Sequence, residues 1–531
     1  MSRRDQWSWP YDDHHAPPIR EPGGRLPVAL VHPGPARLAI STLGWQAVYR
    51  LLAPQPGLAV ERFFLERAQG PAKSEDSGRT LASFPVIAFS AGFEEDLQAI
   101  VGMMLDAGVP PTSTERPHFP FILAGGPLAF LNPAPLSPFV DAFWVGEAEA
   151  GLQQLILRLR DLFLEGADKT QLLDAAVHFP NVYVPGRSSA PVARAASPDL
   201  TDPAFSCFVS SQAEFRDTLL LEINRGCPYG CRFCAAGYIY RPPRTTSLER
   251  AKAIVEQANP VKVGLIGTAL TDWPPLMDFL RWLAERKCAF TLSSLRADGL
   301  TDDLVAFLRR RGVRTVTLAL EGPSRRLRNA ARKNLEEADL LAAVRRCAVY
   351  GVNHLKLYLI VGWPGETDAD YDELDGFLGE ITNARDQGLG NRKKQYMRIT
   401  LSASCLCPKP HTPLQWAPMA SEEMLKKRLA QVKAMVKRHK GLALLPDNPG
   451  RARLQGYLAR SGPEAAPLVL EAARSGSWRK ALKHCGVDEA SVLDRERDEE
   501  EAFPWEAVDP GANRNLLRRE WLRYKQAAGL P

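Results

Sequence analysis

Short apolar runs alternate with amphipathic segments over residues 27–165, which is typical of an α/β fold. The apolar runs lie at 28–31, 58–60, 86–89, 121–124 and 142–145. Between them the spacing predicts helices over 43–52, over 94–105 and after Glu147. Five strands that alternate with helices predict a doubly wound parallel sheet, whose ligand crevice lies beyond the carboxyl ends of the strands.

A second stretch of alternating strands and helices covers residues 216–404. Its β-prone runs lie at 218–223, 261–267, 290–293, 315–320, 355–361 and 397–401. Ser247, a hydroxyl cap followed by Glu249, predicts the start of the first helix after the first run. We therefore expect a second parallel α/β unit, with its functional residues at the carboxyl ends of the strands.

The other segments lack this alternation. Residues 1–26 are rich in Trp, Pro, His and Asp and predict an irregular arm. Residues 166–215 hold short strand-like pieces, such as 182–184, between Ser-, Ala- and Pro-rich runs that are typical of a linker. Residues 405–531 are mostly helical in pattern, with a clear amphipathic run at 424–439. The predicted divisions are an arm (1–26), a sheet domain (27–165), a linker (166–215), a second α/β unit (216–404) and a helical region (405–531).

Three cysteines, Cys227, Cys231 and Cys234, lie on one short loop after the first strand of the second unit. The spacing Cys-x3-Cys-x2-Cys allows three thiolates to bind one metal centre, and the glycines within it allow the chain to curl. A closed zinc site or a fully cysteine-ligated cluster needs four ligands, and no fourth cysteine is near. The spacing therefore indicates an iron-sulfur cluster with one iron open to an outside ligand; the alternatives are a structural zinc knuckle or unrelated cysteines.

This cysteine pattern resembles the cluster motif of the radical SAM superfamily, in which the open iron binds S-adenosylmethionine (SAM). The resemblance implies a [4Fe-4S] cluster and SAM as cofactors, and a 5′-deoxyadenosyl radical that abstracts hydrogen from a substrate. It also implies that residues 216–404 form a partial (β/α)6 barrel. An electron donor such as ferredoxin or flavodoxin is the expected partner, and the substrate is an unidentified small molecule or peptide.

The resemblance also assigns SAM-binding candidates, most of them at strand ends. They are Phe233, Gly267, Ser294, Arg296, Glu321, Arg328 and Gly365. An arginine suits the SAM carboxylate because a guanidinium can bind it in a bidentate manner. Residues 362–367 resemble the family's Gly-x-Pro-Gly-Glu-Thr turn, which approaches the adenine side. The alternative for the serine and the arginines is a helix cap and surface charges, and no residue is assigned a catalytic role.

The sheet domain resembles the cobalamin-binding domain that precedes the radical SAM core in one large subclass. The cobalamin candidates are Gly44, Gly125, Gly126, Gly146 and Glu147. The Asp-x-His-x-x-Gly motif that supplies a lower cobalt ligand in many cobalamin proteins is absent, and the turn after the first strand carries His32 instead. Cobalamin is therefore an open expectation; the alternative is a domain that shapes the substrate cavity without a cofactor, with His32 as a strand-end residue.

The composition of the chain argues against a membrane-spanning or nucleic-acid-binding protein. The 531 residues are 45% hydrophobic and 24% charged, as in ordinary globular proteins, and no apolar run approaches the roughly 20 residues of a membrane span. The N-terminus lacks the apolar core of a signal peptide, so we expect a cytoplasmic protein. A net charge of +6 is small for this length and does not imply nucleic-acid binding.

The leading hypothesis is a radical SAM enzyme that abstracts hydrogen from an unactivated carbon and, with cobalamin, transfers a methyl group to it. The alternatives are a rearrangement or ring closure with SAM alone, and an iron-sulfur accessory protein without turnover. An RNA methylthiotransferase is disfavoured because no cysteine precedes Cys207 to bind a second cluster. Cys405 and Cys407 are candidates for a second metal, a hydrogen-atom donor or the core, of which the core is favoured.

Overall fold

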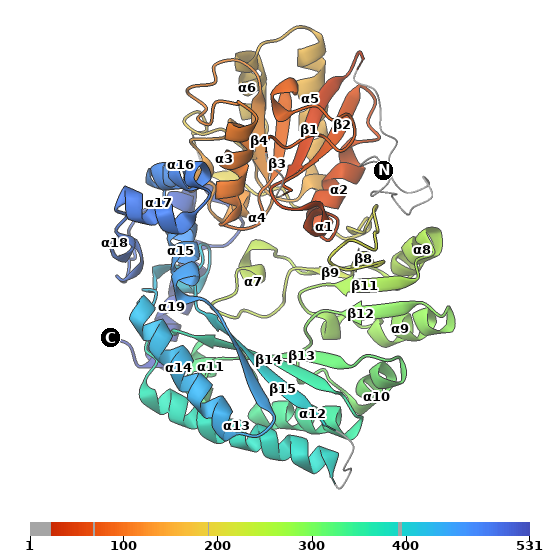
Figure 1. Cartoon of the computed structure of the whole chain (residues 1–531), viewed down its shortest axis with the longest axis vertical. Helices are drawn as coiled ribbons and strands as arrows, with labels where there is room; N and C mark the ends of the chain where they lie inside the picture. The colour runs from red at the N-terminus through yellow and green to blue at the C-terminus, as the bar shows by residue number, and fades with distance from the viewer. Residues whose placement is uncertain (1–22, 67–69, 190, 391–395) are drawn as a thin grey trace.

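The computed structural model describes residues 23–66, 70–189, 191–390 and 396–531 (Figure 1). A sheet domain lies at one end of the molecule and the second α/β unit at the other, with the C-terminal helices along one side of both. Most of the predicted N-terminal arm lies outside the described residues. Within the described part, no helix is both long and apolar enough to cross a membrane.

The sheet domain contains the five predicted strands and a sixth. Its strands are β1 (Leu26–His32), β2 (Leu58–Phe64), β3 (Val86–Ser90), β4 (Phe121–Gly125), β5 (Ala142–Trp144) and β6 (Val182–Tyr183). They are ordered β2-β1-β3-β4-β5-β6. The first five are parallel, whereas β6 is antiparallel to β5. The strand-like piece of the predicted linker therefore completes the edge of this sheet.

Helices cover both faces of this sheet. They are α1 (Ala36–Ala39), α2 (Leu43–Leu52), α3 (Asp96–Asp106), α4 (Pro127–Leu131), α5 (Leu152–Leu164) and α6 (Lys169–Val177). Val31 and Phe89 belong to the same core as the buried face of α3, whereas Leu30 and Ala88 share a core with α2 and α5. The strands are buried on both faces, as in a doubly wound fold, which explains their continuous apolar runs.

The second α/β unit is a partial barrel made of two parallel sheets. The first is ordered β12 (Ala289–Leu292), β11 (Lys262–Ile266), β8 (Leu219–Glu222), and the second β13 (Thr315–Glu321), β14 (His354–Val361), β15 (Arg398–Cys405), β16 (Leu442–Pro446). A parallel bridge between Leu295 and Leu318 connects the two sheets. All six predicted strands are present, and β16 adds a seventh within the region that the sequence pattern marks as mostly helical.

Helices cover the outer side of this barrel. They are α8 (Leu248–Ala258), α9 (Leu276–Glu285), α10 (Asp302–Arg310), α12 (Glu337–Val349) and α13 (Asp368–Leu389), with the short α11 (Arg325–Ala330) after β13 (Figure 1). Ser247 accepts the N–H of Arg250 as the predicted helix cap. Two short antiparallel strands, β9 (Asn224–Arg225) and β10 (Arg244–Thr245), form a small hairpin. The segment between them carries the cysteines and the short helix α7 (Ala236–Ile239).

The C-terminal region joins the two α/β units. Its helices are α14 (Glu422–Arg438), α15 (Pro449–Arg460), α16 (Ala466–Ser475), α17 (Trp478–Cys485), α18 (Glu489–Leu493) and α19 (Arg514–Ala528). Helix α16 packs against α3 of the sheet domain, while α19 packs against α11 of the barrel. A short strand, β17 (Val508–Asp509), also pairs with β7 (Val192–Ala193) from the predicted linker.

A buried carboxylate after β5 ties the sheet domain to the hairpin. Glu147 accepts hydrogen bonds from Arg244 at 2.6 and 2.8 Å, from Arg194 at 3.1 Å and from the N–H of Ser197 at 2.9 Å. Arg225 lies 2.9 Å from the same carboxylate. Burial alone would raise the pKa of Glu147, but the hydrogen bonds from Arg244 and the charge of Arg225 outweigh it and lower that pKa. Arg225 and Arg244 lie on β9 and β10, so this carboxylate holds the hairpin in place.

Replacing Glu147 should therefore loosen the contact between the two units. We expect Glu147→Ala to lower the free energy of unfolding by about 3–5 kcal/mol, because it leaves buried guanidinium groups without a counter-charge. Urea denaturation followed by tryptophan fluorescence measures this loss. The matched control is Glu149→Ala, which removes a more exposed partner of Arg225 and should cost no more than about 1 kcal/mol. Equal losses in the two variants would contradict the assignment.

Candidate functional site

The cysteine loop, residues 226–235, curls between β9 and α7. Gly226 has a φ of 79°, and a Cβ there would lie 2.1 Å from the backbone oxygen of Tyr240, so only glycine fits. The N–H of Cys234 donates to the oxygen of Cys231 at 3.1 Å, which closes a tight turn between two of the thiols. Cys231 is buried, whereas Cys227 and Cys234 are partly exposed.

The three thiols influence one another electrostatically. Burial is the main reason that the pKa of Cys231 is raised to about 11, and charge on Cys234 or Cys227 would raise that pKa further. Burial likewise raises the pKa of Cys227 and of Cys234. Iron binds thiolates, so assembly of a metal centre here would release protons.

The donor set of the site is three thiols on one loop. Among the described residues, no three His, Cys, Asp or Glu side chains are gathered as they would be around one metal ion. Three neighbouring thiols on one loop suit an iron-sulfur cluster with one iron left open.

Cationic side chains lie near the cysteine loop. Among the charged groups, Lys333 has the largest lowering effect on the pKa of Cys231, and its ammonium contacts Glu321 at 3.0 Å. The guanidinium of Arg296 lies over the ring of Tyr229 in the loop, 3.8 Å from the centroid. Positive charge favours an anionic group such as a thiolate-bound cluster. Lys333 and Tyr229 were missed at the sequence level: Lys333 belongs to no motif, and Tyr229 is a position that the spacing of the cysteines leaves unspecified.

An asparagine fixes the turn after β11 against the cysteine loop. The side chain of Asn224 accepts the N–H of Thr268 at 2.7 Å and donates to the oxygen of Ala269 at 2.8 Å. A Cβ at Gly267 would lie 2.3 Å from the Asn224 side-chain oxygen, so this glycine makes room for the asparagine. The hydroxyl of Thr268 also donates to the backbone oxygen of Gly226. The turn that contains Gly267 is thereby held beside the cysteines.

Two further SAM candidates lie at neighbouring strand ends. Ser294 follows β12 and is exposed, two residues before Arg296. Glu321 ends β13 with a φ of 71°, next to an irregularity in the ladder with β14. Positive φ is costly for a side chain of this kind and is often found at functional sites. These positions, together with Arg296, are grouped on the side of the barrel that carries the cysteine loop.

Arg328, in contrast, uses both of its terminal nitrogens for internal contacts. It is 1% exposed, and it donates to the oxygens of Gly322 at 3.1 Å and Pro323 at 3.3 Å. It also pairs with Glu337 at the start of α12. Burial lowers its pKa despite this partner. The guanidinium thus holds the turn after β13, and its predicted contact with the SAM carboxylate remains a prediction.

The turn after β14 contacts the cysteine loop on another side. Glu366 accepts the N–H groups of Gly362 at 2.9 Å and Trp363 at 3.0 Å, so the acidic residue of this motif organises its own turn. The ring of Trp363 meets Phe233 edge-on, with 5.3 Å between centroids. Gly365 has a φ of 78°, and a Cβ there would lie 3.0 Å from the oxygen of Ala528 in α19.

The inner wall of the barrel is polar. On β13, β14 and β15 the buried side chains alternate with partly or fully exposed ones. The buried set packs with the outer helices, so the alternate set faces the interior. Its members include Thr317, Ala319, Lys356, Tyr358, Ile360, Thr400, Ser402 and Ser404, and at the strand ends Thr315, Glu321, His354 and Arg398. The ammonium of Lys356 lies 5.0 Å from the ring centroid of Tyr358. This interior suits a polar substrate and differs from the packed core of a closed barrel.

The cobalamin candidates lie at the edge of the sheet that faces the barrel. Figure 1 shows α1 and α4, which follow β1 and β4, on the side of the sheet toward α7. A Cβ at Gly126 would lie 2.6 Å from the oxygen of Ala91, and one at Gly146 would lie 2.3 Å from that of Ala195. These two glycines, like Glu147, serve contacts within the chain. Gly44 has nothing within 4 Å of an added Cβ, and Gly125 has Trp144 at 3.8 Å.

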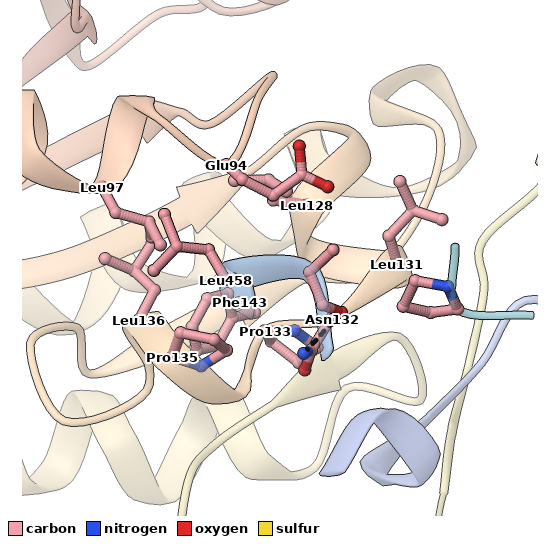
Figure 2. Close-up of a pocket in the computed structure, with 12 residues that line it drawn as sticks. Glu94, Leu97, Leu128, Leu131, Asn132, Pro133, Pro135, Leu136, Phe143 and Leu458 are labelled. Carbon is pink, nitrogen blue, oxygen red and sulfur yellow. Dashed lines mark hydrogen bonds between the residues drawn. The ribbon is translucent and has the colours of Figure 1, made fainter. Parts of the chain in front are cut away.

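The segment after β15 crosses to the sheet domain. Lys409 pairs with Glu94, next to a mostly apolar pocket where α3 and α4 meet α15 (Figure 2). Asn132 in the wall of this pocket donates to the oxygens of Ala459 at 3.1 Å and Ser461 at 2.8 Å. Since Glu94 and Asn132 are both paired, this pocket belongs to the packing between units.

Cys405 and Cys407 lie at the start of this segment. Burial raises the pKa of Cys405 to about 12 and also raises that of Cys407. The charge of Lys409 opposes the rise at Cys407 without reversing it. Cys405 is buried and Cys407 is partly exposed, and the assignment of this pair to the core stays a prediction.

Comparison with known proteins identifies the class. A model described as "Radical SAM superfamily" matches residues 221–378, and one described as "Radical SAM proteins, N-terminal" matches residues 44–185. Together these matches span more than half of the chain and include both the cysteine loop and most of the sheet domain. The chain belongs to the radical SAM superfamily.

The chain is also similar to three individual proteins. An uncharacterised protein of Methanocaldococcus jannaschii, MJ0966, is 29% identical over 391 residues, which cover 72% of this chain and 78% of that protein. The structure of TsrM, a radical S-adenosylmethionine methyltransferase from Kitasatospora setae, covers 87% of this chain and 98% of its own, at 12% identity and a TM-score of 0.52. The cobalamin-dependent S-adenosylmethionine radical enzyme OxsB has 16% identity and a TM-score of 0.48, covering 85% of this chain and 62% of its own.

The similarity to TsrM extends over 87% of this chain. The predicted fold class, a doubly wound parallel sheet followed by a partial barrel and a helical region, is thereby confirmed. At this identity the similarity concerns the fold alone.

A buried histidine after the Cys405–Cys407 segment makes stability depend on pH. His411 is 7% exposed, and its Nε2 atom has no hydrogen-bond partner among the described residues. Burial lowers its pKa to about 3. In the unfolded chain the pKa is near 6.5, so as pH falls below this value the unfolded state takes up the proton first. The contribution of His411 to the free energy of unfolding is therefore complete above pH 6.5 and is lost progressively as the pH falls toward 3.

We expect the wild type to lose about 2 kcal/mol of unfolding free energy through His411 between pH 7 and pH 5. His411→Asn removes this contribution, and asparagine tolerates the φ of 56° at this position. Urea denaturation of both proteins at several pH values measures the difference between their free energies of unfolding. This difference should become smaller as the pH falls. Parallel stability curves would show that the histidine is not buried in its neutral form.

Proposed function

We propose that this protein is a radical SAM enzyme that abstracts hydrogen from a polar substrate bound within the barrel. The observation that carries the proposal is the loop of three neighbouring thiols, without a fourth, at the carboxyl ends of parallel strands. When bound, the [4Fe-4S] cluster and SAM supply a 5′-deoxyadenosyl radical after transfer of one electron, with methionine as the leaving product. An external reductant, for which ferredoxin or flavodoxin is the expected type, must provide that electron.

The chain's own residues supply binding and orientation. Cys227, Cys231 and Cys234 would hold the irons, while Lys333 and Arg296 place positive charge beside the loop. The turns that contain Gly267 and Gly365 border the loop, and these two glycines make room for Asn224 and for α19. The polar side chains of the inner wall would then orient the substrate below the radical.

Methyl transfer to carbon is the finer form of this proposal, with cobalamin between the sheet domain and the barrel. It is supported by the match to the N-terminal family, by the carboxyl edge of the sheet that faces the barrel, and by the description of TsrM as a methyltransferase. Only part of the predicted cobalamin-binding set is free to contact a cofactor. Gly44 is open to a ligand, whereas Gly126, Gly146 and Glu147 serve internal contacts.

Iron loading and SAM cleavage test the proposal directly. After anaerobic reconstitution with iron and sulfide, we expect about four irons per chain and formation of 5′-deoxyadenosine from SAM once a reductant is added. Cys231→Ala should abolish SAM cleavage and lower the iron content, while Cys485→Ala, a partly exposed cysteine on α17, should leave both unchanged. A loaded cluster without SAM cleavage would instead favour an accessory role.

Cobalamin binding is tested separately. Protein refolded or expressed with hydroxocobalamin should retain about one equivalent after gel filtration, visible in its absorbance spectrum. Gly44→Trp should reduce this retention without affecting iron content, because the added ring would occupy the open space beside α2. Full cluster loading without cobalamin retention would favour rearrangement or ring closure with SAM alone.

A further inference from the structure

Arg232 lies between two residues of the cysteine loop, Cys231 and Phe233, and uses most of its donors at once. Its backbone N–H donates to the oxygen of Ala331 at 2.9 Å, and its Nη1 donates to the oxygen of Ala330 at 2.6 Å. Its Nε and Nη2 atoms lie 3.0 and 2.9 Å from the same oxygen of Glu520. Arg232 thereby joins the cysteine loop to the end of α11 and to α19.

Glu520 is an unusual residue for its position in a charged C-terminal helix. It is 2% exposed, although both residues before it on α19, Arg518 and Arg519, are exposed. Its second oxygen accepts from Arg523, which reaches over it from the surface. A buried carboxylate is costly unless it is paired and hydrogen-bonded, so its burial against Arg232 fixes the position of both groups.

Other contacts bring α19 against the same site. The hydroxyl of Tyr524 donates to the oxygen of Pro364 at 3.0 Å, in the turn after β14. Trp521 stacks on Tyr524 at 5.6 Å between centroids, and both belong to the core that includes Trp363, with Phe233 packed against it. Helix α19 therefore supports the loop and the adjacent turn from the outer side.

We propose that the Arg232–Glu520 pair makes α19 a positioning element for the iron-sulfur cluster. This inference rests on the proposed function, in which the cysteine loop holds that cluster. Neither residue is assigned as a ligand. The pair fixes the loop, so the thiols keep their positions and the bound irons are lost slowly. Glu520 also offsets the positive charge of Arg232, one residue from a ligand. The reduced cluster carries one more negative charge than the oxidised cluster. Removal of the Glu520 carboxylate would therefore favour the reduced form over the oxidised form.

The first test is Glu520→Gln in the reconstituted protein. We expect iron to be lost to a chelator such as EDTA about 10- to 100-fold faster than from the wild type, the usual effect of losing a group that supports a metal ligand. We also expect the midpoint potential of the cluster, followed by electron paramagnetic resonance, to move to a more positive value. The matched control, Arg519→Gln, changes an exposed residue of the same helix and should alter neither property.

A second variant separates positioning from stability alone. Arg232→Met combined with Glu520→Leu replaces the buried pair with apolar side chains, which commonly preserves the stability of the fold. We expect its apoprotein to melt near the wild-type temperature while its holoprotein still releases iron faster. If this double variant and Glu520→Gln both keep iron as long as the wild type, the positioning role is wrong. Wild-type protein that holds no iron would overturn the proposed function together with this inference.

Discussion

Three thiols on a short loop must keep fixed positions, and a loop of this length has no core of its own. Neighbouring segments therefore determine its shape. Gly226 lies against Tyr240, Asn224 joins the turn after β11 to the loop, and Arg232 connects it to α11 and α19. The geometry of the site is thus a property of several distant parts of the chain.

The same hairpin that carries the cysteine loop is attached to the sheet domain. Arg225 and Arg244 flank the loop in sequence and meet the carboxylate of Glu147 after β5. Any rotation of the sheet domain relative to the barrel would strain this buried group of charges and reach the loop through β9 and β10. The two units are therefore coupled mechanically through the hairpin that carries the cysteine loop.

The sequence predicts the strands well because most are buried on both faces and leave continuous apolar runs. It fails for β16, whose residues are half-exposed and directly follow a long amphipathic helix. The cysteine motif predicts the ligands, but the support of the loop depends on pairs such as Arg232 and Glu520, 288 residues apart, which no local pattern reveals. Arg328 shows a different limit. Its place in the sequence predicts a contact with SAM, but does not reveal that its side chain binds a backbone oxygen and a carboxylate of the chain itself.

The distance in sequence between the cysteine loop and α19 has a consequence for biosynthesis. Glu520 is translated 288 residues after Arg232, a delay of about 15 to 60 s at ordinary elongation rates. During that interval the nascent barrel can form its local contacts while its thiols lack their outer support. Metal insertion into this protein is thus best suited to the period after α19 has been synthesised and has docked.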